Sequence, residues 1–561
     1  MSAPSLKPSA FQTAQPVNVA ERLSDIARRF PETVAVATPG SGDVAGKNCY
    51  TTCTFAELER DATALARGLV ELGVKRGMRL VLLVQPGVEF VKLTLALLRS
   101  GATTVLIDPG MGRSHLLRCL AATQPEGFVA ISRAQAVRTI LHQRFPQTRI
   151  NVTVGRRWFW GGPTYKKLLE RGQQSRATLP ITCSSDPAAI IFTSGSTGPP
   201  KGVLYTHQMF DTQAVEIRRQ YDIHPGSTDL ACFPLFGLFN SVMGVTTVFP
   251  DMDFARPASA DPTKLLAAAN DWQITQAFAS PAVWRKLSRH CTEAGEMIAT
   301  LRKVFSCGAP VPADVLRRTL SVVAAGATMH TPYGATESLP IATIEAAEVL
   351  EETAALTDQG AGFCVGKKFN SVEWRIIRIT DASLESIDQV EELPRGEIGE
   401  LIVRGPQVSP EYVIGTDHNA QAKIADGDSN WHRLGDVGYF DAGQRFWYCG
   451  RKSHRVITPE KTLYTIPCEA IFNAHSEVTR SALVGVGRRG NASPVLVVEP
   501  HVNGPTDRLE EELWQLAGKH PHTATIQQIL FHKSLPVDVR HNSKINRELL
   551  AKWASQQLQN P

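Results

Sequence analysis

The chain has 561 residues, and at roughly 150 residues per domain this length predicts three or four folding units. Hydrophobic residues make up 43% and charged residues 20%, which is typical of globular proteins and excludes extensive disorder, collagen-like repeats and disulfide frameworks. The net charge of +5 is too small over this length to indicate a nucleic-acid-binding surface. Residues 451–561 contain 14 Lys/Arg and 10 Asp/Glu, so most of the excess lies near the C-terminus.

The cysteines and the N-terminus indicate a reducing compartment. The ten cysteines are scattered without a C-x-x-C pair or zinc-ligand spacing, and we expect reduced thiols. The first residues lack the apolar core of a signal peptide, and no window has the roughly 18 consecutive apolar residues that a membrane-spanning helix needs. We therefore predict a cytoplasmic protein with no transmembrane segment.

Helices and strands alternate through the first 370 residues. Residues 1–18 are rich in Pro, Ser and Gln and predict a flexible arm, after which 19–30 show helical spacing. The pattern then predicts a helix over 55–72 capped by Thr54, and a strand, a helix and a strand over 80–84, 88–98 and 103–107. Further strands are predicted at 187–193, 203–207, 273–278 and 303–306. This order predicts α/β layers with largely parallel sheets.

The pattern changes after about residue 370. Short strands separated by Gly, Pro and Asp, at 374–379, 399–403 and 435–440, predict a β-rich subdomain over about 370–450. Beyond it we expect helices near 466–474 and 508–517 and strands around 482–486 and 495–498. The predicted fold class is α/β: a large N-terminal domain of layered, mostly parallel sheets over 19–450, followed by a small α+β C-terminal domain over 451–561.

The most informative segment, residues 190–207, reads IIFTSGSTGPPKGVLYTH. An apolar strand leads into hydroxyls and glycines, and a second strand, expected to end at His207, follows. Glycines let the backbone approach a ligand closely, hydroxyls supply donors, and Lys201 supplies a cation, as polyphosphate binding requires. The segment is not a Walker A loop, because a glycine and a strand follow Lys201. A surface turn is the alternative for a lone loop, but ten such residues between two apolar strands favour a phosphate site.

Residues 193–202 match the T-S-G-[ST]-T-G-x-P-K-G loop of the adenylate-forming superfamily, which this sequence resembles. That superfamily includes acyl- and aryl-CoA synthetases, luciferases and adenylation domains of nonribosomal peptide synthesis. Its other motifs have counterparts in the right order, at 306–310, 333–337, 396–400 with 404–406, 434–436, 450–451 and 542–547. Taken singly, most of these residues would be interpreted as core, turn or surface residues. Because all the motifs occur in the family's order, functional roles are favoured instead.

The resemblance implies adenylation, in which a carboxylate is joined to the α-phosphate of ATP and pyrophosphate leaves. It implies that Lys544 is the main catalytic residue, that Thr336 contacts the α-phosphate, and that Glu337 holds Mg²⁺. Tyr333 would stack on adenine, and Asp436 would accept the ribose hydroxyls with help from Arg451. The other nucleotide-binding residues implied are Thr193, Ser194, Gly195, Ser196, Thr197, Gly198, Lys201, Gly308, Ala309, Pro310 and Gly334.

Several positions depart from the CoA-using members. Gly237 stands where many acyl-CoA synthetases have a histidine, and Glu460 or Lys461 replaces a glycine near the pantetheine path. Ser453 takes the hinge position that is commonly Asp or Lys, and Ser543 replaces the glycine before the catalytic lysine. The acyl pocket is predicted to comprise Phe233, Phe236, Gly237, Phe239 and Ser280.

With residues 249–253, 279–282 and 537–542, these departures resemble the β-lactone synthetases of bacterial long-chain olefin biosynthesis. This resemblance implies that a long-chain 2-alkyl-3-hydroxyalkanoic acid is adenylated and that its own 3-hydroxyl closes a β-lactone, without CoA. It also implies a mobile C-terminal domain and assembly with hydrolase-fold and reductase proteins. The basic C-terminal region suits either a lid over ATP or a docking face.

Two other functions stay open at this point. A long-chain fatty acyl-CoA synthetase would form the same adenylate and pass the acyl group to CoA. An inactive nucleotide-binding scaffold would carry out neither step. For the lactone route, His454 and His541 are both candidate bases for the 3-hydroxyl.

Overall fold

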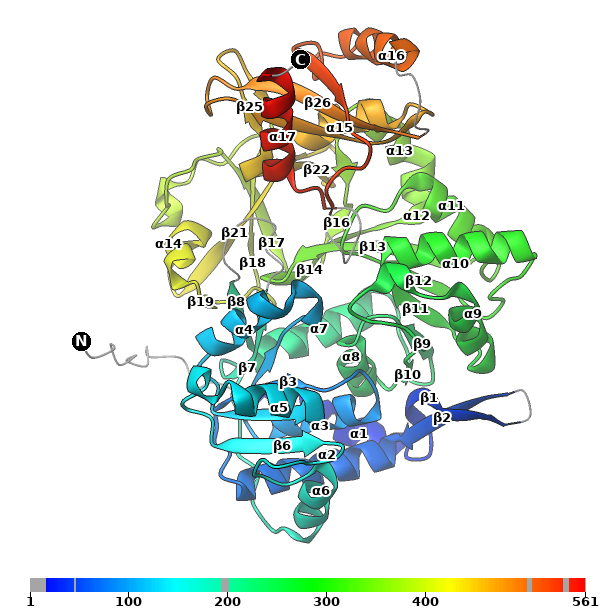
Figure 1. Ribbon diagram of the computed structural model, residues 1–561, viewed down its shortest axis with the longest axis vertical. Coiled ribbons are helices and arrows are strands. Elements are labelled where there is room, and N and C mark those ends of the chain that lie inside the picture. The colour runs from blue at the N-terminus through cyan, green and yellow to red at the C-terminus, as the bar shows by residue number, and fades with distance from the viewer. Residues whose placement is uncertain (1–16, 45–46, 193–200, 502–506, 538–543, 560–561) are drawn as a thin grey trace.

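Two large sheets, with helices between and outside them, form the body of the protein (Figure 1). The computed structural model describes residues 17–44, 47–192, 201–501, 507–537 and 544–559. Most of the predicted arm at 1–18 lies outside the described residues. The same holds for His541 and Ser543 and for the loop residues Thr193, Ser194, Gly195, Ser196, Thr197 and Gly198.

The first sheet has seven strands and a parallel centre. Neighbouring strands are ordered β19 (Tyr412–Ile414), β8 (Gly202–Thr206), β7 (Pro187–Phe192), β4 (Thr103–Leu106), β3 (Arg79–Leu83), β5 (Gly127–Ile131) and β6 (Ile150–Val154). The five strands from β7 to β6 pair in parallel, whereas β8 and β19 add an antiparallel edge. Successive residues face opposite layers, since Leu80 packs into one hydrophobic cluster and Val81 into another.

The second sheet has nine strands and again a parallel centre. Its order is β16 (Lys367–Lys368), β14 (Ser338–Glu345), β13 (Thr328–Ala335), β12 (Lys303–Ser306), β11 (Gln276–Ala279), β9 (Thr228–Ala231), β10 (Thr246–Val248), β1 (Val34–Val44) and β2 (Lys47–Thr54). Strands β1 and β9 to β13 run parallel to one another. The strands β2, β14 and β16 pair antiparallel with their neighbours. The predicted largely parallel sheets are therefore confirmed, while the β1–β2 hairpin was not predicted.

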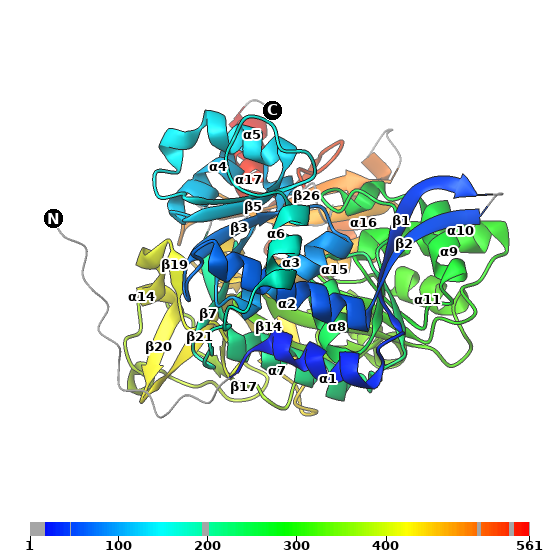
Figure 2. The same ribbon diagram turned by 90° about the horizontal axis from the view of Figure 1, so that it is seen from below.

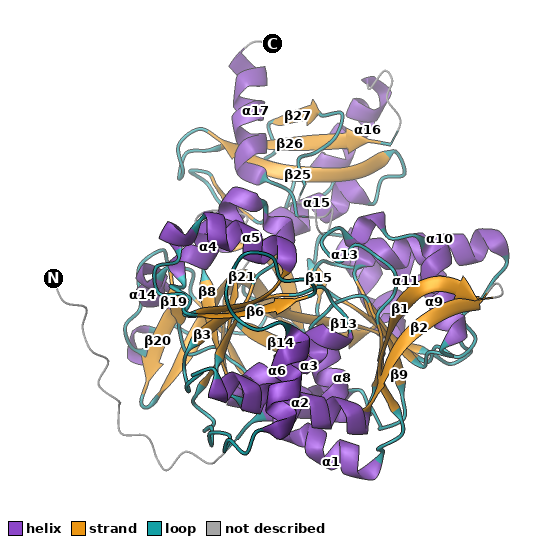
Figure 3. Ribbon diagram, turned by 60° about the horizontal axis from the view of Figure 1, so that its bottom comes forward, coloured by secondary structure: helices purple, strands orange, loops and turns teal. Residues whose placement is uncertain are grey.

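Helices cover both faces of these sheets. Figure 3 shows the helices that lie between them, which include α2 (Phe55–Glu71), α3 (Val88–Arg99) and α8 (Phe236–Met243). The others near this layer are α1 (Arg22–Arg29), α6 (Tyr165–Gln174) and α7 (His207–Gln220). Outside the seven-stranded sheet lie α4 (Arg113–Ala122) and α5 (Ser132–Ile140), and outside the nine-stranded sheet lie α9 (Pro262–Asp271), α10 (Pro281–Ala294) and α11 (Ala313–Ser321). Parallel strands need such cover on both faces.

The helix boundaries follow capping chemistry. The Thr54 hydroxyl accepts a hydrogen bond from the Glu57 amide at 3.2 Å, and the Glu57 carboxylate accepts one from the Thr54 amide at 2.9 Å, which confirms the predicted start of α2. A second cap corrects a prediction. The Thr206 hydroxyl accepts from the Met209 amide, so His207 begins α7 instead of ending β8.

The β-rich region forms a third sheet. It contains β15 (Phe363–Cys364), β22 (Phe446–Arg451), β21 (Ser429–Phe440), β18 (Gly399–Arg404) and β17 (Glu373–Ile377), and β20 (Lys423–Asp426) pairs with β21. Short helices α12 (Ala346–Glu348), α13 (Ala354–Asp358) and α14 (Asn419–Ala422) lie in the connections. This arrangement agrees with the strands expected at 374–379, 399–403 and 435–440.

The C-terminal region lies at one end of the long axis (Figure 1). A hairpin of β23 (Val456–Ile457) and β24 (Thr462–Leu463) precedes a three-stranded sheet of β25 (Val478–Val486), β26 (Ser493–Pro500) and β27 (Gln528–Phe531). Helices α15 (Thr465–Asn473), α16 (Asp507–Gly518) and α17 (Arg547–Gln559) complete it. Its two hydrophobic clusters contain only residues from 456 onward, so this α+β region has a core of its own.

Candidate active site

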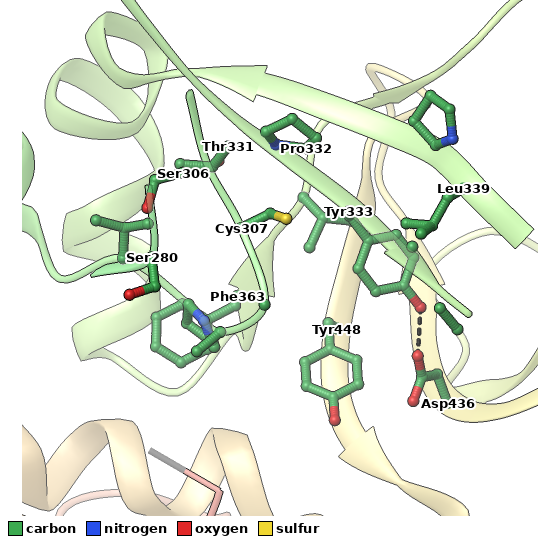
Figure 4. A pocket seen from close by; sticks show the side chains of 18 of the residues that line it. Ser280, Ser306, Cys307, Thr331, Pro332, Tyr333, Leu339, Phe363, Asp436 and Tyr448 are labelled. Atoms are coloured by element: carbon green, nitrogen blue, oxygen red, sulfur yellow. Dashed lines mark hydrogen bonds between the residues drawn. The ribbon is translucent and has the colours of Figure 1, made fainter. Parts of the chain in front are cut away.

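A cavity of about 1320 Å³ opens between the nine-stranded sheet, the β-rich sheet and the C-terminal region. It brings together side chains that lie far apart in the sequence (Figure 4). The predicted residues on its wall are Lys201, Phe233, Phe236, Phe239, Ser280, Gly308, Ala309, Pro310, Tyr333, Gly334, Thr336, Glu337, Asp436, Arg451, Ser453 and Lys544. One cavity therefore brings together every predicted nucleotide-binding residue that the structure describes.

Asp436 is the centre of one polar cluster. Because β21 and β22 pair in register at Asp436 and Arg451, the guanidinium Nε lies 3.0 Å from the carboxylate Oδ1. Tyr333, from β13, donates its hydroxyl to the other oxygen, Oδ2, at 2.5 Å (Figure 4). Burial raises the pKa of Asp436, and Arg451 opposes that shift. Oδ1 accepts no hydrogen bond from a described residue, so it is available to a ligand hydroxyl.

Glu337 is the centre of a second cluster. Its Oε1 accepts a hydrogen bond from the Tyr412 hydroxyl at 2.6 Å, and its backbone carbonyl accepts from the Ser409 amide at 2.8 Å. The Lys201 ammonium lies 5.0 Å from the centre of the Tyr412 ring, where a cation is attracted to the π face. Burial lowers the pKa of Lys201, and Glu337 opposes this shift. The cluster thus places a carboxylate and an ammonium group together at the cavity.

Lys423 belongs to the same cluster, although no sequence motif identified it. Its ammonium, at the start of β20, donates a hydrogen bond to the carbonyl of Ser409, whose amide binds the Glu337 carbonyl. Burial lowers the pKa of Lys423 to about 7, with Glu337 as the largest opposing influence. Tyr412 was likewise missed, because neither residue lies in a motif and both are brought to Glu337 only by the pairing of β19 and β20 with other strands.

A magnesium ion fits this cluster by its donor chemistry. Among the described residues, no group of three or more Asp, Glu, His or Cys side chains could hold a metal alone. Mg²⁺ is commonly bound by one or two carboxylates together with substrate phosphates and water. Glu337 is a carboxylate on the cavity wall beside cationic side chains, and it would hold such an ion between the phosphates of a nucleotide.

The C-terminal region contributes Lys544 and the segment that precedes it. Lys544 lines the cavity, and its charge opposes the rise in the pKa of Asp436 that burial causes. The start of α17 is fixed by the ion pair of Arg547 with Glu469, which is 2.5 Å long and largely buried. His454 also lines the cavity, and burial lowers its pKa to about 4, so its imidazole is neutral at neutral pH.

The segment just after β22 is held by a buried ion pair. Glu400 is fully buried in β18 and binds Arg433 at 2.6 Å. The Lys452 ammonium lies 3.0 Å from the same Glu400 oxygen and donates a hydrogen bond to the carbonyl of Thr380. Lys452 therefore anchors the chain to the β-rich sheet one residue before Ser453, the predicted hinge.

Aromatic rings form the apolar side of the cavity. Phe236 stacks on Phe278 with ring centres 4.1 Å apart, and Phe233 and Phe239 lie within 6.3 Å of Phe236. Ser280 also lines this wall, and its hydroxyl has no hydrogen-bond partner among the described residues. These rings come from α8, from the segment that follows β9, and from β11 itself.

Gly237 differs from the other predicted pocket residues. It is absent from the cavity wall and faces the layer of helices, where a Cβ atom would lie 2.9 Å from both Val91 and Phe249. Gly237 therefore permits close packing of α8 against its neighbours. The sequence placed Gly237 in the acyl pocket, where many acyl-CoA synthetases have a histidine, but here the lack of a side chain is required by the packing of the core.

Comparisons with known proteins agree with this geometry. Residues 23–413 match the pattern that defines the AMP-binding enzymes. The chain belongs to the AMP-binding enzyme family. This AMP-binding enzyme is therefore an adenylate-forming ligase, and ATP is its substrate.

Two curated relatives match almost the whole of this AMP-binding enzyme. The olefin beta-lactone synthetase of Xanthomonas campestris pv. campestris is 44% identical over 549 residues, covering 96% of this chain and 98% of the relative. The olefin beta-lactone synthetase of Stenotrophomonas maltophilia is 44% identical over 554 residues, covering 97% and 99%. Among solved structures, the amide bond synthetase McbA from Marinactinospora thermotolerans has a TM-score of 0.75 at 22% identity, covering 95% of this chain and 99% of its own, which shows the shared fold.

The Asp436 cluster leads to a prediction about ATP. Replacing Asp436 by Asn removes the carboxylate charge while keeping the side-chain shape, and we expect ATP binding about tenfold weaker or more, since hydrogen bonds to charged groups are the stronger kind. The measurement is calorimetric titration with ATP. The matched control is Asp441→Asn, because Asp441 pairs with Arg445 at 2.7 Å in the same hairpin but lies away from the cavity. Equal affinities for both variants would contradict the assignment.

The lowered pKa of Lys423 predicts a pH dependence of stability. Between the pKa of about 7 in the folded protein and the ordinary lysine pKa of 10.5, the unfolded state binds more protons, so the free energy of unfolding should rise with pH across this window. Lys423→Met removes the buried charge. The thermal midpoint of this variant relative to wild type should therefore be more favourable at about pH 6.5 than at about pH 9. A difference that does not change with pH would show that Lys423 titrates normally.

Proposed function

We propose that this AMP-binding enzyme is an ATP-dependent β-lactone synthetase of long-chain olefin biosynthesis. Its substrate is a long-chain 2-alkyl-3-hydroxyalkanoic acid. The substrate carboxylate attacks the α-phosphorus of ATP and pyrophosphate leaves. The 3-hydroxyl oxygen then bonds to the acyl carbon as the bond from that carbon to AMP breaks, and the hydroxyl proton passes to a base. The products are the β-lactone, AMP and pyrophosphate.

The observation that carries this proposal is the 44% identity, over nearly the full length of both proteins, to two olefin beta-lactone synthetases. The cavity supports it, because an aromatic wall adjoins the polar clusters at Asp436 and Glu337, as an amphipathic acid and a nucleotide require. An intramolecular hydroxyl already has a high effective concentration, so a second substrate is not needed.

The residues take their proposed roles from this reaction. Thr193, Ser194, Gly195, Ser196, Thr197, Gly198 and Lys201 would bind the β- and γ-phosphates, and Glu337 would hold Mg²⁺. Gly308, Ala309, Pro310, Tyr333 and Gly334 would surround the adenine. Asp436 and Arg451 would bind the ribose, and Thr336 and Lys544 would stabilise the charge that develops at the α-phosphorus.

The proposal also concerns the organisation of the chain. Residues 19–450 would form the nucleotide-binding body and 451–561 a mobile cap that turns about Ser453 and brings Lys544 to the nucleotide. Assembly with hydrolase-fold and reductase proteins of the same pathway belongs to the same proposal, as does independence from CoA. Glu460 and Lys461 lie in the turn of the β23–β24 hairpin, where Lys461 donates to the Pro521 carbonyl at 2.8 Å.

The alternative function, a long-chain acyl-CoA synthetase, differs in its second step. The purified protein should be incubated with ATP, Mg²⁺ and a racemic 2-alkyl-3-hydroxy acid, with and without CoA, and the products analysed by mass spectrometry. We expect a β-lactone, which is the acid minus water, in equal amount in both reactions. A thioester that forms only with CoA, with no lactone, would refute the proposal. AMP formation would separate both enzymes from an inactive scaffold.

Lys544 gives a second prediction. Lys544→Ala should lower the rate of ATP–pyrophosphate exchange by about 10²–10³, the usual effect of removing one preorganised donor from a developing oxyanion, while ATP binding is largely retained. The control is Lys533→Ala, which removes an exposed lysine of the same region that does not line the cavity. Exchange at the wild-type rate in Lys544→Ala would show that another group fills this role.

A further inference from the structure

Positive charge is concentrated in one segment of the N-terminal body. Residues 127–169 contain eight Lys/Arg and no Asp or Glu. Since the whole chain has a net charge of +5, the other 518 residues together carry −3. The segment comprises β5, α5, the edge strand β6 and the first turn of α6, so it includes one edge of the seven-stranded sheet. Figure 2 shows β5, α5 and α6 near one another.

These charges are exposed and uncompensated. Seven of the eight side chains are exposed, namely Arg133, Arg144, Arg149, Arg156, Arg157, Lys166 and Lys167, and the eighth, Arg138, is half-buried. None of the eight forms an ion pair with another described residue. Elsewhere on the described surface many arginines are paired, as Arg404 is with Glu373 and Asp426. The basic segment therefore offers a surface of one sign to an anionic partner.

Large apolar side chains are exposed within the same segment. Trp158 is 52% and Phe159 73% exposed, in the loop between β6 and α6, and Val137 and Ile140 are 46% and 71% exposed on α5. Ten large apolar side chains are exposed on the described surface, and four of them lie in these 43 residues. Because exposed aromatic rings are unfavourable in water, a cluster of them marks an interaction site.

The loop that carries the aromatic rings is held in place. Trp160 is buried, donates its indole N–H to the Thr153 hydroxyl at 2.8 Å, and packs with its ring centre 5.4 Å from that of Trp158 and 5.2 Å from that of Phe159. The Arg157 guanidinium donates to the Gly162 carbonyl at 2.7 Å. Trp158 and Phe159 are thus presented by a preorganised loop, which reduces the entropy lost on binding.

Helix α5 continues the same surface. The Ser132 hydroxyl, at the first residue of α5, donates to the Arg156 carbonyl at 2.5 Å and joins the helix to the loop. Arg133, Val137 and Ile140 follow at spacings of four and three residues, which places them on one face of the helix. The helix face and the loop therefore both combine exposed arginines with exposed apolar side chains.

We propose that the surface formed by Arg133, Val137, Ile140 and residues 156–159 binds the face of an anionic lipid bilayer. Interfacial segments combine Lys/Arg, which contact lipid phosphates, with Trp, Phe and aliphatic side chains that enter the boundary of the acyl chains. The arginine stems can lie along the apolar region while their guanidinium groups stay with the headgroups. Among the helices that the structure describes, none is long and apolar enough to cross a membrane.

A bilayer accounts for the surface better than an acidic protein does. The four exposed apolar side chains differ in shape and come from a helix and a loop, which matches a fluid partner, whereas a protein partner favours shaped pockets. The charges and apolar side chains of this surface do not depend on the proposed function. If that function holds, a long-chain acid substrate partitions into bilayers, and this surface would bring the enzyme to it.

The experiment is sedimentation of the full-length protein with vesicles. We expect binding to phosphatidylcholine vesicles that contain about 30% phosphatidylglycerol, little binding to phosphatidylcholine alone, and release in about 0.5 M salt, since the attraction is screened. Arg156→Gln/Arg157→Gln should weaken partitioning about 30-fold, at the contribution usual for two basic residues near an anionic surface. Trp158→Ser/Phe159→Ser should weaken it about tenfold or more.

Matched controls keep the result specific. Arg218→Gln/Arg219→Gln removes another adjacent pair of exposed arginines, on α7, and Met297→Ser removes a side chain that is 53% exposed; both should bind vesicles like wild type. All variants should keep the wild-type thermal midpoint and wild-type pyrophosphate exchange with detergent-dispersed substrate. If the wild-type protein itself shows no pyrophosphate exchange, the proposed function is refuted, whereas the lipid proposal still depends only on the vesicle measurements.

Three outcomes would overturn the lipid proposal. The first is that wild-type protein does not distinguish anionic from neutral vesicles. The second is that the patch variants bind vesicles as tightly as wild type. The third is that the patch variants keep vesicle binding but lose binding to an acidic protein, which would identify this face as a protein-docking surface.

Discussion

The site depends on one contact between two neighbouring strands. β21 and β22 pair so that Asp436 faces Arg451, and the chain leaves the β-rich sheet directly after Arg451. The carboxylate is buried, which is unfavourable for its charge, and the guanidinium beside it makes the ionised form tolerable. Tyr333 reaches the same carboxylate from the nine-stranded sheet. The hydrogen bond from Tyr333 to Asp436 thus joins the two sheets at the cavity, and the ion pair of Asp436 with Arg451 stands where the C-terminal region begins.

The cluster at Glu337 likewise places partly buried groups of opposite charge together, and it suits phosphate and a metal ion. Lys201 directly precedes β8 and Lys423 begins β20, so they reach the surroundings of Glu337 from different parts of the chain, and Tyr412, the first residue of β19, holds the carboxylate. When both lysines are protonated they leave a positive excess beside one carboxylate, which is what a polyphosphate with a bound cation requires. Because these groups are partly buried, in surroundings where the dielectric constant is lower than in water, the interactions between their charges are strong. Small shifts of the strands would therefore change the electrostatic energy of the site.

Local patterns allowed much of the fold and site to be predicted, and nonlocal pairing explains what was missed. The strand and helix periods were clear because buried strands such as 80–84 are continuous and apolar and because Thr54 and Glu57 form a capping box. Asp436, Tyr333 and Glu337 were identified by short motifs. Tyr412 and Lys423 were not, because only strand pairing brings them to Glu337. Gly237 was misplaced because sequence spacing cannot tell which side of α8 faces the core. Net charge was compared only between residues 1–450 and 451–561, and the first of these ranges is too long to show the basic segment at 127–169.

The buried pair of Glu400 and Arg433 also constrains how the C-terminal region can move. Lys452 binds Glu400 inside the β-rich sheet, so the backbone up to Lys452 is held to that sheet. A rotation that kept this contact would leave Lys452 in place and would be absorbed at Ser453 and beyond. The axis of such a rotation would then pass close to Arg451, so Arg451 would be displaced least, while the parts of the C-terminal region farthest from this axis would move most.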